Sequence, residues 1–336
     1  MSQWTTRESV IRLNSVQSEK VEICPACGRA EATLWCQGHD RLYHTTDQTF
    51  EYRSCNECGT LYQSVRPVES EVWKCYADSY GPHSAQSKQK ALFNLPVWVN
   101  RGCQKAADLI LGQASFQAWI RQVENSLVTA GDILDFGCGS GKYLDRARKL
   151  GCTTLGIDFS PKALEEVARR GHETMPVSEQ TWNAIASRKL KFVRMNHVVE
   201  HLYDPLRVLR KINDALEEGG YLHLSTPNPV GPSATRYRDA WWGLECPRHI
   251  ALIPPAQLEK MLREAGFKSV TIVQEPIAKD LLRSWAYRRT DAGKLKNVDV
   301  EGLAGDGLLN LLAALPMRKA LQSAGQGDRY HVLAVK

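Results

Sequence analysis

Four cysteines near the amino terminus have the spacing of a metal site. They form two Cys-x-x-Cys pairs, Cys24 with Cys27 and Cys55 with Cys58, and a glycine follows each pair. Two such turns can direct four thiolates at one tetrahedral ion, and the glycine allows the backbone to fold under the metal. We therefore predict a structural Zn²⁺ with no open position for catalysis. The alternative, four reduced cysteines in a core, leaves the paired spacing unexplained.

A glycine-rich turn follows a predicted buried strand in the second part of the chain. Residues 132–144 read DILDFGCGSGKYL, so an apolar run ends at glycines and a helix follows. Such a turn lets a ligand approach the backbone, with the N–H groups of the helix N-terminus facing it. Asp135 stands two positions before the first glycine. Its carboxylate would repel the pyrophosphate of a dinucleotide and suits a ligand that carries an amino group.

A second predicted strand ends in an acidic residue. Residues 153–161 read TTLGIDFSP, in which Asp158 closes the strand, Ser160 is a helix N-cap and Pro161 occupies the first turn. Asp158 lies 21 residues after Gly137, which is the place where an acidic side chain binds the ribose hydroxyls of an adenosine. The two segments together predict a ligand that contains adenosine.

These segments resemble the class I S-adenosylmethionine-dependent methyltransferases, and further matching segments follow in the family's order. They are MNHVVEHLYDP at 195–205, LEEGGYLHLSTPNP at 216–229, PRHI at 247–250, EAGF at 264–267 and GDRYHVLAVK at 327–336. The resemblance implies an α/β fold with a doubly wound, seven-stranded Rossmann-like sheet. That sheet would be parallel except for an antiparallel final strand, with helices on both faces.

The resemblance also implies that S-adenosylmethionine binds at the carboxyl edge of this sheet. The glycines would bound its methionine part, and Asp158 would bind its ribose. Tyr76 and Tyr80 would either close over the sulfonium through cation–π attraction or pack in a helical lid. Glu179 and Trp182 are candidates for the adenine contact. The expected cofactor-binding residues are Asp135, Gly137, Cys138, Gly139, Gly141, Asp158, Phe159, Asn196, Tyr76 and Tyr80.

Histidines gather after the predicted strand 190–195, at the edge where α/β folds place their ligands. Methyl transfer to a hydroxyl requires alignment and removal of a proton, which suits imidazole near neutral pH. The candidate catalytic residues are His201, His249, His197 and Glu200. One alternative is a structural role. The other is a divalent-cation site of the kind found in some ubiquinone-pathway and small-RNA methyltransferases, which have an acid where this chain has His197.

The chain is predicted to have four parts. They are a polar tail at 1–20, a zinc-ribbon-like module at 21–65, a helical lid or linker at 66–130, and a methyltransferase domain at 131–336 with an insertion at 277–327. The insertion holds a leucine-rich run followed by Arg318 and Lys319. That run either packs against the domain or touches a lipid surface or a lipid-linked substrate. The pair Trp241 and Trp242 either stacks on a sugar or aromatic acceptor or pins a loop.

Composition narrows the class of protein. The 336 residues are 43% hydrophobic and 24% charged, with a net charge of +6, and they contain no apolar run near the roughly 20 residues that cross a membrane. The first residues lack the apolar stretch of a secretory signal, so we expect a cytoplasmic protein with reduced cysteines. Residues 21–65 hold more acidic than basic side chains, which argues against a nucleic-acid partner.

The sequence therefore predicts a methyltransferase that acts on the hydroxyl of a small molecule, sugar or glycan. The zinc module and the segment 73–83 resemble a bacterial subgroup associated with surface-polysaccharide and sugar modification, which favours a sugar. The alternatives are C-methylation of a nucleotide sugar, an RNA-modifying methyltransferase with a zinc ribbon, and an interaction protein that keeps the fold without turnover. The intact glycine turn and Asp158 count against the last of these.

Overall fold

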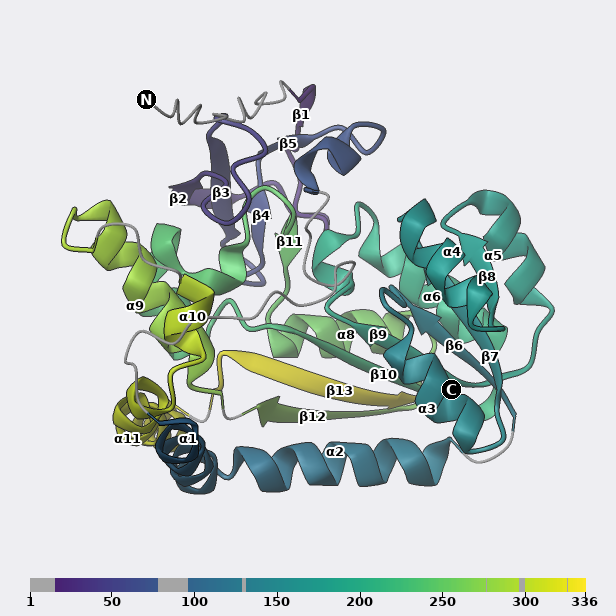
Figure 1. Ribbon diagram of the computed structural model, residues 1–336. Helices are drawn as coiled ribbons and strands as arrows, with labels where there is room; N and C mark the ends of the chain where they lie inside the picture. Colours follow the sequence, from purple (N-terminus) through teal and green to yellow (C-terminus); the bar gives the residue numbers. More distant parts are fainter. Residues whose placement is uncertain (1–15, 78–95, 129–130, 276, 296–299, 325) are drawn as a thin grey trace, which may run out of the picture.

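Figure 1 shows the computed structural model of the chain, which describes residues 16–77, 96–128, 131–275, 277–295, 300–324 and 326–336. Most of the predicted polar tail and Tyr80 lie outside the described residues.

A seven-stranded sheet forms the centre of the molecule. Its strands are β6 (Asp132–Phe136), β7 (Thr153–Asp158), β8 (Glu173–Pro176), β9 (Leu190–Asn196), β10 (Leu216–Pro227), β12 (Ser269–Glu275) and β13 (Arg329–Val335). They lie in the order β12-β13-β10-β9-β6-β7-β8. Strands β6 to β10 pair in parallel, whereas β13 runs antiparallel to β10 and β12. The predicted α/β sheet with an antiparallel final strand is confirmed.

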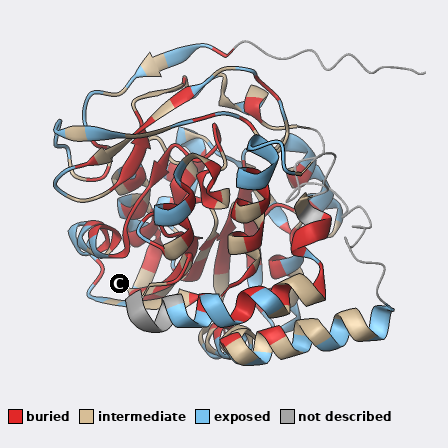
Figure 2. Ribbon diagram, turned by 90° about the vertical axis from the view of Figure 1, so that its left-hand side faces the viewer, coloured by how far each residue is buried: buried red, intermediate tan, exposed pale blue. Residues whose placement is uncertain are grey.

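Helices cover both faces of the sheet because its strands are apolar on both sides. The covering helices are α3 (Lys142–Lys149), α4 (Pro161–Arg169), α5 (Glu179–Ala186), α6 (Pro205–Ala215) and α8 (Pro255–Glu264). Leu134 of β6 packs in one apolar cluster with α5, α6 and α8. Its neighbour Ile133 points to the other face and packs with α3 and α4. Figure 2 shows these buried residues in red at the centre of the molecule, with exposed residues on the outer helix faces.

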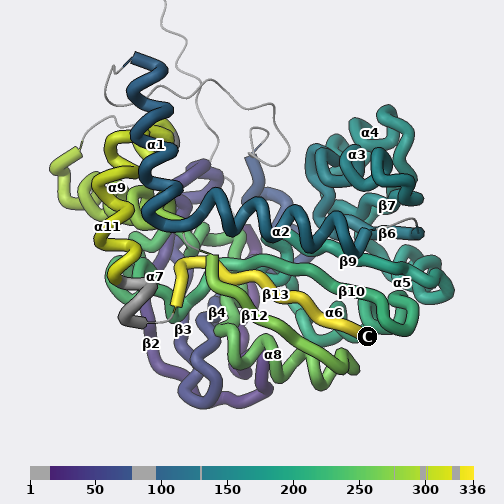
Figure 3. Tube along the Cα trace, turned by 90° about the horizontal axis from the view of Figure 1, so that it is seen from below, coloured from purple at the N-terminus to yellow at the C-terminus, as the bar shows by residue number. Residues whose placement is uncertain are grey.

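The helices of the predicted lid pack against the central sheet and against the insertion. They are α1 (Val97–Leu111) and α2 (Gln113–Leu127). Helix α1 packs against α11 (Gly307–Ala324), and Figure 3 shows α2 running alongside β9, β10 and β13 of the sheet. Glu124 of α2 is buried there and pairs with His223 of β10 at 2.9 Å. These helices bury their amphipathic faces on the sheet and on α11, and none of their residues belongs to the described lining of the pocket discussed below.

The amino-terminal module shares a sheet with the methyltransferase part. Strands β2 (Ala32–Gly38), β3 (Phe50–Cys55) and β4 (Leu61–Gln63) form a four-stranded sheet that β11 (Ala251–Leu252) completes by pairing with β4. The short strands β1 (Ser18–Lys20) and β5 (Val65–Pro67) pair beside it. The predicted boundary at residue 65 therefore separates segments that lie in one structural unit.

A buried ion pair adds to this connection. Arg248 Nη2 lies 2.9 Å from Asp40 Oδ1, and both side chains are fully buried. Arg248 also donates through Nη1 to the carbonyl oxygen of Cys75 at 2.9 Å. A buried charge that loses its partner is strongly destabilising. The pair therefore holds the amino-terminal module to the loop that precedes β11.

Three helices fill the predicted insertion between β12 and β13. They are α9 (Lys279–Asp291), α10 (Val300–Ala304) and α11, and their apolar side chains pack with α1 in one cluster. Leu303 is buried, whereas Leu312 and Leu315 are exposed. Packing thus accounts for part of the leucine-rich run, and lipid contact stays a prediction. Among the described helices, none combines the length and the apolar character needed to cross a membrane.

The remaining short elements connect these parts. The 3-10 helix η1 (Val72–Cys75) follows the amino-terminal module, and η3 (Val199–His201) follows β9. Between β10 and β11 lie α7 (Pro232–Tyr237), η4 (Arg238–Ala240) and η5 (Trp242–Leu244).

Candidate functional site

A cavity of about 1390 Å³ opens at the carboxyl ends of β6, β7, β9 and β10. The glycine turn lines one side of it, and Tyr43 of the amino-terminal module and Tyr76, which follows η1, line another. The insertion contributes Lys279 and Arg283. Pockets for a single small ligand usually measure about 300–1,000 Å³. This cavity therefore has room for a cofactor and an acceptor together.

The glycine turn has the backbone shape that the sequence predicts. Gly137, Gly139 and Gly141 have φ values of 79°, 47° and 68°, in the left-handed region that favours glycine. A Cβ atom on Gly137 would lie 2.5 Å from Cγ2 of Val198. The turn thus leaves bare main chain at the edge of the pocket, where a ligand can approach it. The buried side chain of Cys138 also belongs to the lining.

Asp158 lies at the end of β7 beside this turn. Its Oδ2 accepts a hydrogen bond from the Gly139 N–H and its Oδ1 accepts one from the Ser160 N–H, both at 2.9 Å. The carboxylate is buried and faces the pocket. Each carboxylate oxygen can accept a second hydrogen bond. The site therefore fits a ligand with two neighbouring hydroxyl groups.

Asp135 is buried in β6 and faces the pocket. Burial raises its pKa to about 6, although Arg194 opposes the shift. Arg194 Nη1 lies 3.2 Å from Asp135 Oδ1. Sequence reasoning missed Arg194, although an arginine inside the apolar strand LKFVRMN is a detectable signal. The pair leaves Asp135 a suitable partner for a cationic amino group.

Aromatic and amide side chains complete the predicted cofactor end. The rings of Tyr76 and Phe159 lie 4.6 Å apart by their centroids, and both residues line the pocket. Asn196 Oδ1 accepts a hydrogen bond from the Ser225 hydroxyl at 2.6 Å. Tyr80 falls outside the described residues, so its role stays a prediction.

The two adenine candidates differ in their surroundings. Trp182 lines the pocket and stacks on Phe136 with ring centroids 5.3 Å apart. Glu179 also belongs to the lining, but its side chain is exposed and pairs with Arg207 at 2.7 Å. The indole is therefore the better placed of the two to pack against an adenine.

His197 lines the pocket and forms a hydrogen-bonded pair with the buried carboxylate of Glu200. His197 Nδ1 lies 3.1 Å from Glu200 Oε1, and Arg329 Nη1 lies 3.3 Å from His197 Nε2. Because a guanidinium only donates, Nε2 is the unprotonated nitrogen and Nδ1 carries the proton. His197 has a φ of 54°, an uncommon conformation for a residue with a side chain and one that clusters at functional sites.

Glu200 is fully buried and accepts hydrogen bonds on both oxygens. Besides the contact with His197, its Oε2 accepts from the Thr226 hydroxyl at 3.0 Å. Burial opposes its ionisation, but the hydrogen bond from His197 and the electrostatic effect of the neighbouring histidines outweigh that effect and lower its pKa to about 2. The carboxylate is therefore ionised at neutral pH and orients the imidazole of His197.

His201 and His249 stand beside this pair. The His201 Nδ1 lies 2.9 Å from the carbonyl oxygen of Arg248, and burial lowers the pKa of His201 to about 4. His249 Nδ1 lies 2.8 Å from the carbonyl oxygen of Gly243. Among the described residues, Glu200, His201 and His249 place one ligand atom each within 4.8 Å of one another. The cation site considered from the sequence consisted of His197, Glu200 and His201. In the structure, His249 takes the place of His197 in the group that converges.

The two adjacent tryptophans have different environments. Trp241 is 2% exposed and packs in an apolar cluster with Leu244 and Tyr52. Trp242 lines the pocket and stacks with Tyr287 at a centroid distance of 5.6 Å. Each tryptophan therefore fits one of the two sequence alternatives. Trp241 pins the loop, and Trp242, which lines the pocket, can touch an acceptor.

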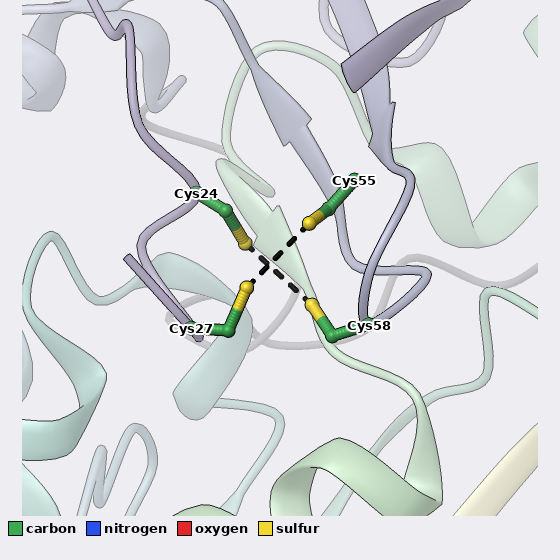
Figure 4. Close-up of side chains that lie close together, drawn as sticks. All are labelled: Cys24, Cys27, Cys55 and Cys58. Carbon is green, nitrogen blue, oxygen red and sulfur yellow. Dashed lines mark hydrogen bonds between the residues drawn. The ribbon is translucent and has the colours of Figure 1, made fainter. Parts of the chain in front are cut away.

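The four cysteines of the two pairs converge at one point, as Figure 4 shows. The Sγ atoms of Cys24 and Cys58 are 3.7 Å apart, those of Cys27 and Cys55 are 3.5 Å apart, and all four lie within 4.8 Å of one another. Tetrahedral Zn–S bonds of ~2.3 Å require S–S separations of ~3.8 Å. The arrangement fits the ion that the spacing predicts.

Comparison with known proteins agrees with this geometry. A family model described as a methyltransferase domain matches residues 112–272. The "Ubiquinone biosynthesis O-methyltransferase" of Thiobacillus denitrificans is 30% identical over 166 residues, which make up 45% of this chain and 70% of that protein. The protein of the same name from Dinoroseobacter shibae is 30% identical over 150 residues, 41% of this chain and 60% of that protein. The chain thus covers between 60% and 70% of the length of these two relatives.

A solved structure described as a SAM-dependent methyltransferase from Archaeoglobus fulgidus aligns with 67% of this chain and 94% of its own, at 18% identity and a TM-score of 0.46. The sequence matches carry the family assignment. The chain belongs to the class I S-adenosylmethionine-dependent methyltransferases.

Proposed function

We propose that the protein methylates a hydroxyl group of a small-molecule acceptor, with His197 as the base. S-adenosylmethionine supplies an activated methyl group when it is bound. The acceptor oxygen forms a bond to the methyl carbon while the carbon–sulfur bond breaks, and sulfur keeps that electron pair. The hydroxyl proton passes to His197 Nε2. The observation that carries the proposal is the hydrogen bond between His197, which lines the pocket, and the buried carboxylate of Glu200.

Glu200 supports this role through its charge. Its ionised carboxylate holds the Nδ1 proton of His197 and stabilises the imidazolium that forms when Nε2 takes up a proton. Arg329 contacts Nε2 before the acceptor arrives, so the acceptor hydroxyl replaces or shares that contact. The names of the two relatives support an oxygen acceptor.

The cluster of Glu200, His201 and His249 offers a second way to activate the hydroxyl. One carboxylate and two imidazoles make a suitable donor set for a divalent cation, and such an ion would acidify a bound hydroxyl. Dialysis against EDTA separates the two schemes. Activity that is lost at an unchanged zinc content and returns with added Mg²⁺ favours the cation, whereas unchanged activity favours His197 as an unaided base.

An acceptor screen tests the reaction itself. S-adenosylmethionine with a radiolabelled methyl group is incubated with the enzyme and with catechols, sugars, nucleotide sugars, cell-envelope glycans and tRNA. Recovery of the label in an alkali-stable methyl ether of a catechol, sugar or glycan supports the proposal. A new carbon–carbon bond in a nucleotide sugar, or a label in tRNA, would instead support the C-methylating or RNA-modifying alternative.

We propose further that Cys24, Cys27, Cys55 and Cys58 hold a structural Zn²⁺. The sulfur separations and the burial of Cys24 and Cys55 support this assignment. Four thiolates fill a tetrahedral site, so the ion would do no chemistry on the acceptor. Its role would be to hold the segments that carry Tyr43 and Tyr76 against the pocket.

Asp158 is expected to bind the ribose of the cofactor. Replacing it with asparagine should weaken the binding of S-adenosylhomocysteine about 10- to 100-fold, because charge-assisted hydrogen bonds are worth ~1.5–3 kcal/mol. Isothermal titration calorimetry gives the affinity. Asp132 begins β6, whereas the pocket lies at the carboxyl ends of the strands. Asp132→Asn is therefore the matched control and should bind the cofactor normally. An unchanged affinity in Asp158→Asn would rule out the ribose assignment.

The raised pKa of Asp135 predicts that cofactor binding depends on pH. Its pKa is raised to about 6, so the carboxyl group becomes protonated below that pH and loses the charge that attracts an amino group. The affinity for S-adenosylmethionine should therefore fall by up to about tenfold per pH unit below pH 6 and level off above about pH 7. Calorimetric titrations between pH 5 and 8 measure it. Asp135→Asn should remove this dependence, and a constant wild-type affinity over the range would refute the assignment.

A further inference from the structure

The strand order of the sheet determines the order in which the functional residues lie along the pocket. Asp158 ends β7, Asp135 lies in β6, His197 follows β9 and Arg329 begins β13. In the sheet these strands lie in the order β7-β6-β9-β10-β13, and neighbouring strands are ~4.8 Å apart. The cofactor residues thus occupy one end and His197 the middle. The far end of the pocket is formed by β10, β13 and the insertion.

The lining of the far end carries an excess of positive charge. Lys279, Arg283 and Arg329 all line the pocket there, together with Asp280. Asp280 Oδ2 lies 2.6 Å from Arg329 Nε, and its Oδ1 lies 3.0 Å from Arg283 Nη1. One carboxylate therefore faces two guanidinium groups, and the ammonium of Lys279 adds a third cation.

Two of these cations, Arg283 and Arg329, are held in place before any ligand binds. The guanidinium carbon of Arg283 lies 4.4 Å from the centroid of the Trp242 ring, which itself stacks on Tyr287. Another acid of the lining, Glu245, is paired with Arg248 at 3.1 Å. A guanidinium fixed by packing loses little conformational freedom when it binds a ligand. The far end is thus a preorganised cationic wall.

We propose that this wall binds an oxyanion of the acceptor, a carboxylate or a phosphate, through Lys279, Arg283 and Arg329. The inference rests on the proposed transfer to an acceptor hydroxyl at His197. Arg329 Nη1 and His197 Nε2 are 3.3 Å apart, so the oxyanion and the reacting hydroxyl belong to the same small part of the acceptor, such as substituents of one ring. A wholly neutral acceptor would cover the net positive charge of this lining without balancing it, which is costly.

Matched pairs of probes test the wall and distinguish a carboxylate from a phosphate. Calorimetry on enzyme saturated with S-adenosylhomocysteine compares 3,4-dihydroxybenzoate with catechol, and glucose 1-phosphate with glucose. At least one anionic probe should bind about tenfold or more tightly than its neutral partner, as expected for a charge-assisted contact, and the responding pair names the anion. Equal affinity within both pairs would overturn the proposal.

Variants of the cationic wall test whether its residues cause the preference for the anionic probe. Lys279→Gln and Arg283→Gln should each reduce the preference for the anionic probe about tenfold. Arg289→Gln is the matched control, because Arg289 is exposed on the same helix α9 and does not line the pocket. It should keep the preference. If both pocket variants keep it as well while remaining folded in thermal unfolding, the assignment is wrong.

The readout separates this inference from the proposed reaction. Binding is measured without turnover, so failure to find a methylated product does not alter the comparison of probes. Conversely, O-methylation of an acceptor with no preference for oxyanions in either pair would leave the proposed function standing and remove the oxyanion site.

Discussion

Replacing His197 with glutamine is expected to lower kcat about 10²- to 10⁴-fold, the usual contribution of a general base. Glutamine retains a polar side chain near Glu200 and Arg329 but cannot accept a proton at neutral pH. The binding of S-adenosylhomocysteine should change little, because His197 lies beside the cofactor end and not within it. Steady-state kinetics with an acceptor found in the screen, together with calorimetry, measures the two effects separately.

A matched control is available at His44. This residue is exposed, does not line the pocket, and has a φ of 50°, close to that of His197. His44→Gln makes the same chemical change at the same kind of backbone position and should leave kcat unchanged. If His197→Gln retains wild-type kcat, the base must be another group, and His249 or a bound cation becomes the next candidate.

Replacing Cys24 with serine is expected to release one zinc ion per chain and to disrupt the amino-terminal module. Structural zinc contributes about 10–16 kcal/mol of binding free energy at neutral pH, and this energy is coupled to folding. Cys24 and Cys55 pack in the same apolar cluster as the central sheet, so the loss should also lower the thermal unfolding temperature. Methyl transfer should fall as well, because Tyr43 and Tyr76 line the pocket.

Elemental analysis and thermal unfolding of the purified protein check this expectation. Cys103→Ser serves as the control, since Cys103 lies in α1 outside the cysteine cluster; it should keep its zinc and its activity. A wild-type protein without zinc, or a Cys24→Ser variant with wild-type zinc content, would contradict the zinc assignment.

Features encoded in short segments could be predicted from the sequence. The glycine turn and Asp158 follow apolar strands directly, so their place at the sheet edge depends on local pattern alone. The cysteine pairs depend on two local turns, and their convergence needs only that the turns meet. The structure brings the predicted residues Asp135, Asp158, His197 and His201 to one pocket.

Features that depend on distant contacts could not be predicted. Asp40 and Arg248 are 208 residues apart, and nothing in either segment indicates that they pair. The contacts of Arg329 with Asp280 and His197 likewise depend on how the insertion folds back. The sequence predicts a helical lid or linker at 66–130, but a local helical pattern does not distinguish packing over a pocket from packing on the face of a sheet. Only the tertiary structure assigns α2 to the sheet.

A crystal structure of the protein soaked with S-adenosylhomocysteine tests the central claim most directly. The account predicts density along the main chain of Gly137 and Gly139, with the ribose hydroxyls on Asp158, the amino group near Asp135, and the sulfur directed toward His197. Density for the compound elsewhere on the protein, or an adenosine that makes no contact with Asp158, would contradict the account.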